Sequence, residues 1–249
     1  MIATHLGSLG AAVAVHGTTP TSARAFDEAE SLEAVALGVA ARTGRRVVAV
    51  PADLTDERQV RAAFAQIRGE LGRIDILVAN AGGDIGAGGI FAGRGGKPEH
   101  NDCVTIAVAD VRAVLDRNLL SCILTCRAVA PEMMERRSGR IVTMGSVAGF
   151  EARAEGAIYA TAKAAVHAFT RCLAAQLRPF NVAVNCVAPG GTVTARFLAT
   201  GQADPAVLAK GDTLEGYGQP EDIARAVEFF VTDAGRHVTG QVLRVDGGA

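Results

Sequence analysis

The sequence predicts an α/β fold in which helices cover both faces of a doubly wound parallel sheet. Short apolar, β-branched runs alternate with helical patterns, whose apolar residues lie three or four positions apart and which end at a glycine. The strand-like runs cover residues 11–17, 46–50, 74–80, 140–145, 182–188 and 241–245. Alternating strands and helices form right-handed crossovers between parallel strands. Ligands bind beyond the carboxyl ends of such strands, so the residues after each run are the functional candidates.

The first strand-like run is preceded by a short amphipathic segment. Residues 2–9 have helical spacing, Gly10 ends the pattern, and the run 11–17 follows directly. A sequence that begins inside a helix predicts a fold that is truncated at its N-terminus.

Composition limits the class of protein. The chain has 249 residues, of which 49% are hydrophobic and 20% are charged, with a net charge of -1. A single domain over residues 1–249 is therefore expected. The sequence has no apolar run of membrane-spanning length and no leader pattern, which predicts a cytoplasmic protein without a membrane partner. The near-zero charge and the lack of a long basic run argue against nucleic acid as a partner.

Cysteine and histidine spacing predicts that the chain holds no metal. The five cysteines include no CxxC pair, and the five histidines show neither HxxxH nor HExxH spacing.

A serine, a tyrosine and a lysine follow the run 140–145. Ser146 comes directly after it, and Tyr159 and Lys163 lie four positions apart, which places them on one face of a helix. A phenol exchanges protons poorly at neutral pH unless a nearby ammonium stabilises the phenolate, and Lys163 would supply that charge. Ser146 would then hold a substrate oxygen while Tyr159 exchanges a proton with it. Taken alone, a Tyr and Lys at this spacing are as often an exposed surface pair.

Several further motifs follow in a fixed order, and together they resemble the short-chain dehydrogenase/reductase family from about residue 5 to the end. The motifs are Asp53-Leu54, NAG at 80–82, Asn118 in DRNLL, GSVAG with Ser146, YATAK with Tyr159 and Lys163, PGGTVT at 189–194, and TGQVLRVDGG. The resemblance implies a Rossmann-like single domain and an NAD(P)-dependent oxidoreductase. Such an enzyme interconverts a carbonyl and a secondary alcohol of a small molecule by hydride transfer, and it assembles as a homodimer or homotetramer.

The resemblance also implies a role for each matched residue. Tyr159 is the general acid/base, Lys163 stabilises its phenolate and binds the nicotinamide ribose, Ser146 orients the substrate, and Asn118 positions a water. The cofactor-binding set comprises Thr18 near the adenosine ribose, Asp53 and Leu54 at the adenine, Asn80, Ala81 and Gly82 along the adenosine ribose, and Pro189, Gly190, Thr192 and Thr194 around the nicotinamide amide and pyrophosphate. Local alternatives exist: Asn118 could satisfy backbone groups in its helix, Pro189 and Gly190 could form a turn, and Thr192 and Thr194 could cap helices.

Cofactor and substrate preferences have weaker signals. The positions that choose between NAD and NADP in this family correspond to Gly17 and Thr18, which carry no carboxylate to repel a 2′-phosphate, and this favours NADP over NAD by a small margin. Residues of about 192–217 resemble the variable substrate loop of the family and name no substrate.

One motif of the family is missing. The TGxxxGxG loop, whose amides and helix N-terminus bind the pyrophosphate, does not occur at the start of the chain. The sequence could start at an internal methionine of a longer gene, it could belong to a truncated, redox-inactive relative that acts as a binding or oligomerisation module, or the neighbouring strands 11–17 and 74–80 could pair directly. We expect a six-stranded or locally rearranged sheet.

Overall fold

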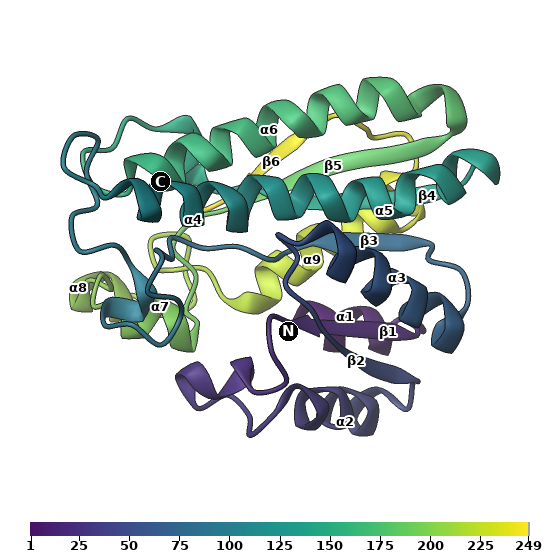
Figure 1. The fold of residues 1–249 in the computed structure, drawn as a ribbon, viewed down its shortest axis with the longest axis horizontal. Coiled ribbons are helices and arrows are strands. Elements are labelled where there is room, and N and C mark those ends of the chain that lie inside the picture. Colours follow the sequence, from purple (N-terminus) through teal and green to yellow (C-terminus); the bar gives the residue numbers. More distant parts are fainter. Residues whose placement is uncertain (249) are drawn as a thin grey trace.

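The computed structural model describes residues 1–248, which form an α/β fold of parallel strands and packed helices (Figure 1). The strands are β1 (Val13–Gly17), β2 (Val47–Pro51), β3 (Ile76–Ala79), β4 (Gly139–Met144), β5 (Val182–Pro189) and β6 (Val242–Val245). The α-helices are α1 (Ile2–Ser8), α2 (Leu32–Thr43), α3 (Glu57–Leu71), α4 (Val108–Leu115), α5 (Ser121–Glu135), α6 (Ala157–Leu177), α7 (Ala195–Ala199), α8 (Pro205–Leu208) and α9 (Pro220–Val231). Each of the strand-like runs in the sequence overlaps one of these strands.

The strands form two sheets. β1 pairs in parallel with β2, whereas β3, β4, β5 and β6 form a separate parallel sheet in that order. Figure 1 shows the four-stranded sheet above the β1–β2 pair. The expected direct pairing of 11–17 with 74–80 is therefore wrong for the described residues, and the six strands do not make one continuous sheet. β1 and β3 each keep one edge without a described strand partner.

Helix α1 explains why the two sheets remain apart. It packs against β1, α2 and α9. Its Ile2 and Leu6 join the apolar cluster that α9 forms with β4 and β5, and its Ala3 joins the cluster around Val15. Direct pairing of β1 with β3 would narrow the sheet and displace these close-packed contacts. The helix expected over residues 2–9 is confirmed as Ile2–Ser8.

Helices cover both faces of the four-stranded sheet because side chains along each strand alternate in direction. Ile141 on β4 faces the large cluster built with α3, α5 and α6, whereas Val142 and Met144 face the cluster built with α9. This arrangement confirms the doubly wound pattern. The loops that contain the candidate site follow the carboxyl ends of β4 and β5.

The two helices that flank β2 end at glycines, as the sequence predicts, and the structure adds their N-caps. Ser31 caps α2 by accepting a hydrogen bond from the Ala34 N–H at 3.0 Å. Asp56 caps α3 by accepting from the N–H groups of Arg58 and Gln59. Both helices end at a glycine. The caps therefore determine where α2 ends and where α3 begins, and β2 lies between these two points.

Candidate active site

The chain turns sharply after β4, and Ser146 begins that turn. Ser146 caps the short helix Val147–Phe150, and its Oγ accepts a hydrogen bond from the Ala148 N–H at 3.2 Å. The hydroxyl hydrogen is not used in that contact, because the oxygen acts as the acceptor. The side chain can therefore still donate a hydrogen bond to a substrate oxygen.

Helix α6 brings Tyr159 and Lys163 to the same place. Lys163 is buried, with 4% of its surface exposed, and its Nζ donates a hydrogen bond to the Met144 carbonyl at 2.8 Å. Met144 ends β4 two residues before Ser146, so the bond anchors the ammonium at the carboxyl end of that strand. The same Nζ lies 5.6 Å from the centroid of the Tyr159 ring. The Lys163 ammonium therefore lies near the Tyr159 ring at the end of β4.

Asn118 lies in a π-helical turn, Asp116–Leu120, between α4 and α5. Its side chain is buried and bonds to the backbone three times: Oδ1 accepts from the Gly83 N–H at 2.9 Å, and Nδ2 donates to the carbonyls of Gly83 and Val114, each at 2.8 Å. The local alternative for this residue is observed, because Asn118 satisfies a carbonyl of its own helix, and it also holds the segment after β3 by two hydrogen bonds. A π-helical turn is often associated with functional sites.

The segment after β3 needs glycine. Gly82 and Gly83 have φ angles of 146° and 145°, which residues with a Cβ rarely adopt. A Cβ on Gly82 would lie 2.6 Å from Asn118 Oδ1 and 3.4 Å from Lys163 Nζ. The Gly82 backbone is therefore bordered closely by the side chains of both Asn118 and Lys163.

His167 is a member of this site that the sequence analysis did not select. It lies one turn after Lys163 on α6 and is 3% exposed, and its Nε2 accepts a hydrogen bond from the Ser146 N–H at 3.4 Å. Its ring lies 4.5 Å from that of Phe150. Burial, followed by the charges of Arg171 and Lys163, lowers the pKa of His167 to about 4, so the ring is neutral at neutral pH. The sequence feature that could have identified His167 is its spacing of four residues from Lys163.

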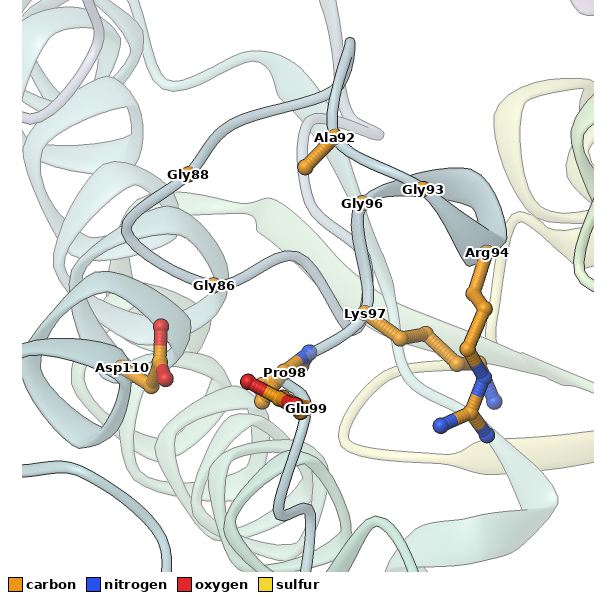
Figure 2. A pocket seen from close by; sticks show the side chains of 10 residues that line it. All are labelled: Gly86, Gly88, Ala92, Gly93, Arg94, Gly96, Lys97, Pro98, Glu99 and Asp110. Atoms are coloured by element: carbon orange, nitrogen blue, oxygen red, sulfur yellow. The ribbon is translucent and has the colours of Figure 1, made fainter.

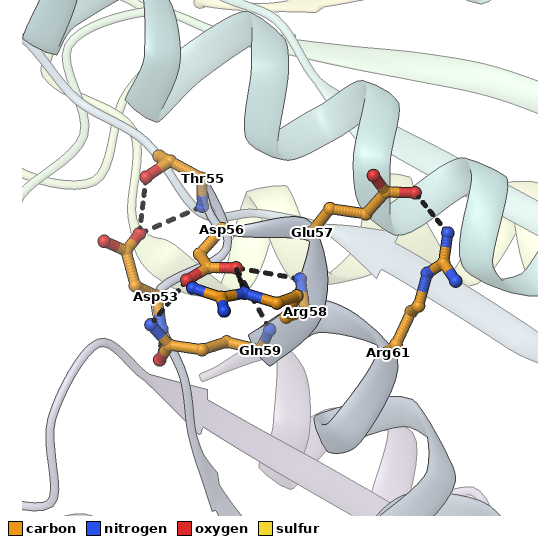
Figure 3. Close-up of polar contacts among 7 residues, drawn as sticks. All are labelled: Asp53, Thr55, Asp56, Glu57, Arg58, Gln59 and Arg61. Atoms are coloured by element: carbon orange, nitrogen blue, oxygen red, sulfur yellow. Dashed lines mark hydrogen bonds and ion pairs between the residues drawn. The ribbon is translucent and has the colours of Figure 1, made fainter.

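Residues expected at the adenine lie after β2, on the other sheet. Asp53 Oδ1 accepts hydrogen bonds from the Thr55 N–H at 2.9 Å and from the Thr55 hydroxyl at 2.8 Å (Figure 3). In the same view, Glu57 pairs with Arg61 at 2.8 Å on the exposed side of α3. Leu54 is partly buried between the clusters of the two sheets, and it therefore connects them.

The other expected cofactor contacts differ in exposure. Thr18 and Asn80, which follow β1 and β3, are exposed, while Ala81 is half-buried. After β5, Pro189 ends the strand and the Gly190 N–H bonds to the Val245 carbonyl at 2.9 Å.

Two threonines follow that strand. Thr192 forms a β-bridge with Gly218, and Thr194 caps α7 by accepting a hydrogen bond from the Phe197 N–H at 3.1 Å. The helix-cap alternative is thus observed for Thr194, and Thr192 instead donates to the Gly190 carbonyl at 3.2 Å.

A pocket of about 430 Å³ lies beside the site, within the glycine-rich segment between β3 and α4 (Figure 2). Figure 2 shows Arg94 and Lys97 extending to the same side, away from Asp110. The residues that line the pocket include none of the proposed catalytic residues. The pocket is therefore a neighbouring hollow rather than the catalytic centre.

None of the helices in the described part of the chain is long and apolar enough to cross a bilayer. Within residues 1–248, no three His, Cys, Asp or Glu side chains come together in a way that could hold a metal ion.

Comparisons with known proteins identify the family. A family model described as enoyl-(acyl carrier protein) reductase matches residues 2–249. Cyclohexanol dehydrogenase of Rhodococcus sp. (strain TK6) is 42% identical over 214 residues, which cover 82% of this chain and 73% of that protein. The chain belongs to the short-chain dehydrogenase/reductase family, whose members named here are oxidoreductases.

Solved structures support the same assignment. Levodione reductase has a TM-score of 0.83 at 26% identity, with coverage of 99% of this chain and 91% of the other. The 7α-hydroxysteroid dehydrogenase solved with NADH and 7-oxo glycochenodeoxycholic acid has a TM-score of 0.81 at 29% identity, with coverage of 100% and 88%. The predicted Rossmann-like fold is confirmed.

Proposed function

We propose that the protein is an NAD(P)-dependent oxidoreductase that interconverts a carbonyl and a secondary alcohol of a small molecule. The observation that carries this proposal is the Lys163 ammonium beside the Tyr159 ring, anchored at the end of the strand that leads to Ser146. A phenol, an ammonium and a free hydroxyl at one strand end suit proton exchange with an alcohol oxygen. The relative that is named for cyclohexanol supports an alcohol as substrate.

The chain's own residues would act on the substrate oxygen. In the direction of reduction, the Tyr159 hydroxyl donates its proton to the carbonyl oxygen, and Lys163 stabilises the phenolate that remains. Ser146 donates a hydrogen bond to the same oxygen and fixes its position. Asn118 would hold a water that passes the proton onward through Lys163. When bound, the nicotinamide supplies or accepts the hydride at the substrate carbon.

The residues present fit the nicotinamide end of a dinucleotide better than its pyrophosphate. The buried Lys163 ammonium would supply a donor to a ribose, and Gly82 exposes bare backbone beside it. At the pyrophosphate, the sequence has no TGxxxGxG loop to supply amide donors, and β1 and β3 lie in separate sheets. We therefore propose that the 249-residue chain binds the dinucleotide weakly.

Cofactor preference and assembly follow as further parts of the proposal. Thr18 is exposed and uncharged at the end of β1, which supports NADP over NAD.

Val104 and Val108, before and at the start of α4, are 89% and 65% exposed, and contact with a second copy of the chain would remove this apolar surface from water. We propose a homodimer or homotetramer in the cytoplasm, which sedimentation equilibrium would test for assembly and cell fractionation for location.

The experiment compares the two tyrosines of the chain. With cyclohexanol as substrate, Tyr159→Phe removes the proton donor but keeps the ring, so turnover should fall by roughly a hundredfold or more with little change in Tm. Tyr217→Phe is the matched control, because its hydroxyl accepts a hydrogen bond from the Asp204 N–H at 3.0 Å, in the loop between β5 and α9. A Tyr159→Phe protein that keeps most of its turnover would contradict the proposal.

Lys163→Met separates the two roles given to the lysine. Turnover should fall as far as in Tyr159→Phe, and the affinity for the dinucleotide should fall as well. Unchanged affinity in a calorimetric titration would show that Lys163 does not bind the ribose.

A further inference from the structure

Arg196 on α7 reaches across to the glycine-rich segment between β3 and α4. Its Nη2 donates a hydrogen bond to the Asp84 carbonyl at 3.0 Å, and its Nε donates to the Gly95 carbonyl at 3.3 Å. These two bonds hold the guanidinium at a fixed position between the loop after β5 and the loop after β3.

The remaining nitrogen of Arg196 lies against the candidate site. Nη1 is 3.1 Å from the position that a Cβ on Gly83 would occupy. Gly83 is the residue that Asn118 clamps, and its neighbour Gly82 borders Lys163 in the same way. Burial lowers the pKa of Arg196, while the nearby Tyr159 and Asp84 act in the opposite direction.

No carboxylate among residues 1–248 lies within ion-pair distance of Arg196, and Asp84 acts on its charge only from farther away. The carboxylate of Asp84 instead accepts a hydrogen bond from Asn101 Nδ2 at 2.6 Å and lies 3.7 Å from Lys97 Nζ. Arg94, the next cation along the segment, pairs with Glu155 at 2.9 Å. Arg196 and Lys163 are therefore two cations at the candidate site that donate hydrogen bonds to backbone carbonyls.

A partly buried cation without an acidic partner favours binding of an anion. A guanidinium has five N–H donors, and two of those of Arg196 are used by the two carbonyls. The donors that remain form the planar fork that matches the two oxygens of a carboxylate. A neutral substrate would leave this charge uncompensated.

We propose that Arg196 is a specificity-determining residue that binds a carboxylate of the substrate, so that the substrate is an oxo acid or the corresponding hydroxy acid. The inference rests on the proposed function for its reaction, and it adds the class of substrate. The carboxylate bonds to the Arg196 guanidinium at one end of the molecule while the carbonyl oxygen lies at Tyr159 and Ser146. The same contact holds α7 and the segment after β3 against the bound substrate.

The test uses substrates that differ in one charge. The 2-, 3- and 4-oxocyclohexane-1-carboxylates and their methyl esters are assayed with wild type, Arg196→Gln, Arg196→Lys and the control Arg94→Gln. We expect wild type to prefer at least one acid over its ester in kcat/KM. Arg196→Gln should lower that preference by at least tenfold, mainly through KM of the acid, and Arg196→Lys should lower it less. Arg94→Gln should keep the wild-type ratio, because Arg94 already pairs with Glu155.

Binding without turnover distinguishes the inference from the proposed function. Calorimetric titration with the three acids should show binding to wild type that is weakened at least tenfold in Arg196→Gln. Such binding in a protein that reduces none of the compounds would contradict the proposed function and support the inference. Reduction with equal acid-to-ester ratios in wild type and Arg196→Gln would overturn the inference and leave the proposed function intact. Failure of all three acids to bind and to react would also overturn the inference.

Discussion

Val142 on β4 and Val184 on β5 have no exposed surface, whereas on β1 only Val15 is buried and His16 is exposed. β3, at the edge of the four-stranded sheet, is also only half-buried along most of its length. The two sheets therefore differ in how completely they are enclosed. Strands β4 and β5 lie between packed helices on both faces, while the β1–β2 pair contacts smaller clusters on α2 and α3.

This difference divides the candidate site. Ser146 follows the largely buried strand β4, Tyr159 and Lys163 lie on α6, and the Lys163 bond to Met144 connects the two elements. Thr18 and Asp53, which are expected near the adenosine, follow the strands of the smaller sheet. The part that would perform the reaction is thus held in place by the core, and the part that would hold the cofactor's adenosine is attached less firmly. Stability and cofactor binding should respond to different substitutions.

Lowering the pH should decrease the free energy of unfolding through His167, which lies on α6 against the four-stranded sheet. The unfolded chain has a histidine pKa of about 6.5, whereas burial lowers the pKa of folded His167 to about 4. As pH falls from about 6.5 to about 4, the unfolded chain therefore gains a proton that the folded chain does not, and the unfolding free energy decreases by at most about 3 kcal/mol. Urea denaturation at a series of pH values in wild type and His167→Gln measures this contribution.

The difference between the two proteins is the quantity of interest, because the carboxylates titrate in both. Wild type should lose more stability than His167→Gln between pH 6.5 and 4. Parallel curves would show that His167 accepts a proton freely in the folded protein.

Equivalent truncations in the two sheets compare their packing directly. Val184→Ala removes two methyl groups from a fully buried position on β5 and should cost about 2 kcal/mol, because a cavity remains among close-packed neighbours. Val13→Ala on β1 removes the same groups from a half-buried position and should cost less than about 1 kcal/mol. Equal losses in the unfolding free energy would contradict the difference between the sheets.

The smallest expected effect is on the ratio of the affinities for NAD and NADP. It is tested at Thr18, which follows β1 in the two-stranded sheet. Gly17 is unsuitable for the test, because a Cβ there would lie 2.5 Å from Ser22 Oγ. Thr18→Asp places a carboxylate at the neighbouring exposed position and should shift the affinity ratio toward NAD by roughly tenfold or less, since it repels a 2′-phosphate and accepts from a 2′-hydroxyl. Thr18→Asn is the uncharged control. An unchanged ratio would show that Thr18 does not border the ribose.

The sequence predicts the strands and the helix ends because these depend on neighbours along the chain. Apolar spacing locates β1 to β6, and Ser31 and Asp56 cap α2 and α3 from positions next to them. The spacing of Tyr159 and Lys163 likewise follows from helix geometry. The division into two sheets could not be predicted this way, because it depends on how α1 packs between distant elements.

Arg196 shows the same limit within the site. Its hydrogen-bond partners Gly95 and Asp84 lie 101 and 112 positions earlier in the chain. No local pattern connects an arginine on α7 with a glycine-rich loop so far away. His167 is the intermediate case, since its spacing from Lys163 is local but its contact with Ser146 requires the fold.

Calorimetric titration of the 249-residue chain with NADPH and NADH tests the comparison of the two halves most directly. The pyrophosphate would lack the amide donors and the helix end of a glycine-rich loop, each worth on the order of 1 kcal/mol or more, and the adenosine contacts lie on the less enclosed sheet. We predict a dissociation constant weaker than about 1 µM for both cofactors, with NADPH bound somewhat more tightly. A dissociation constant of about 1 µM or tighter for either cofactor would contradict the account.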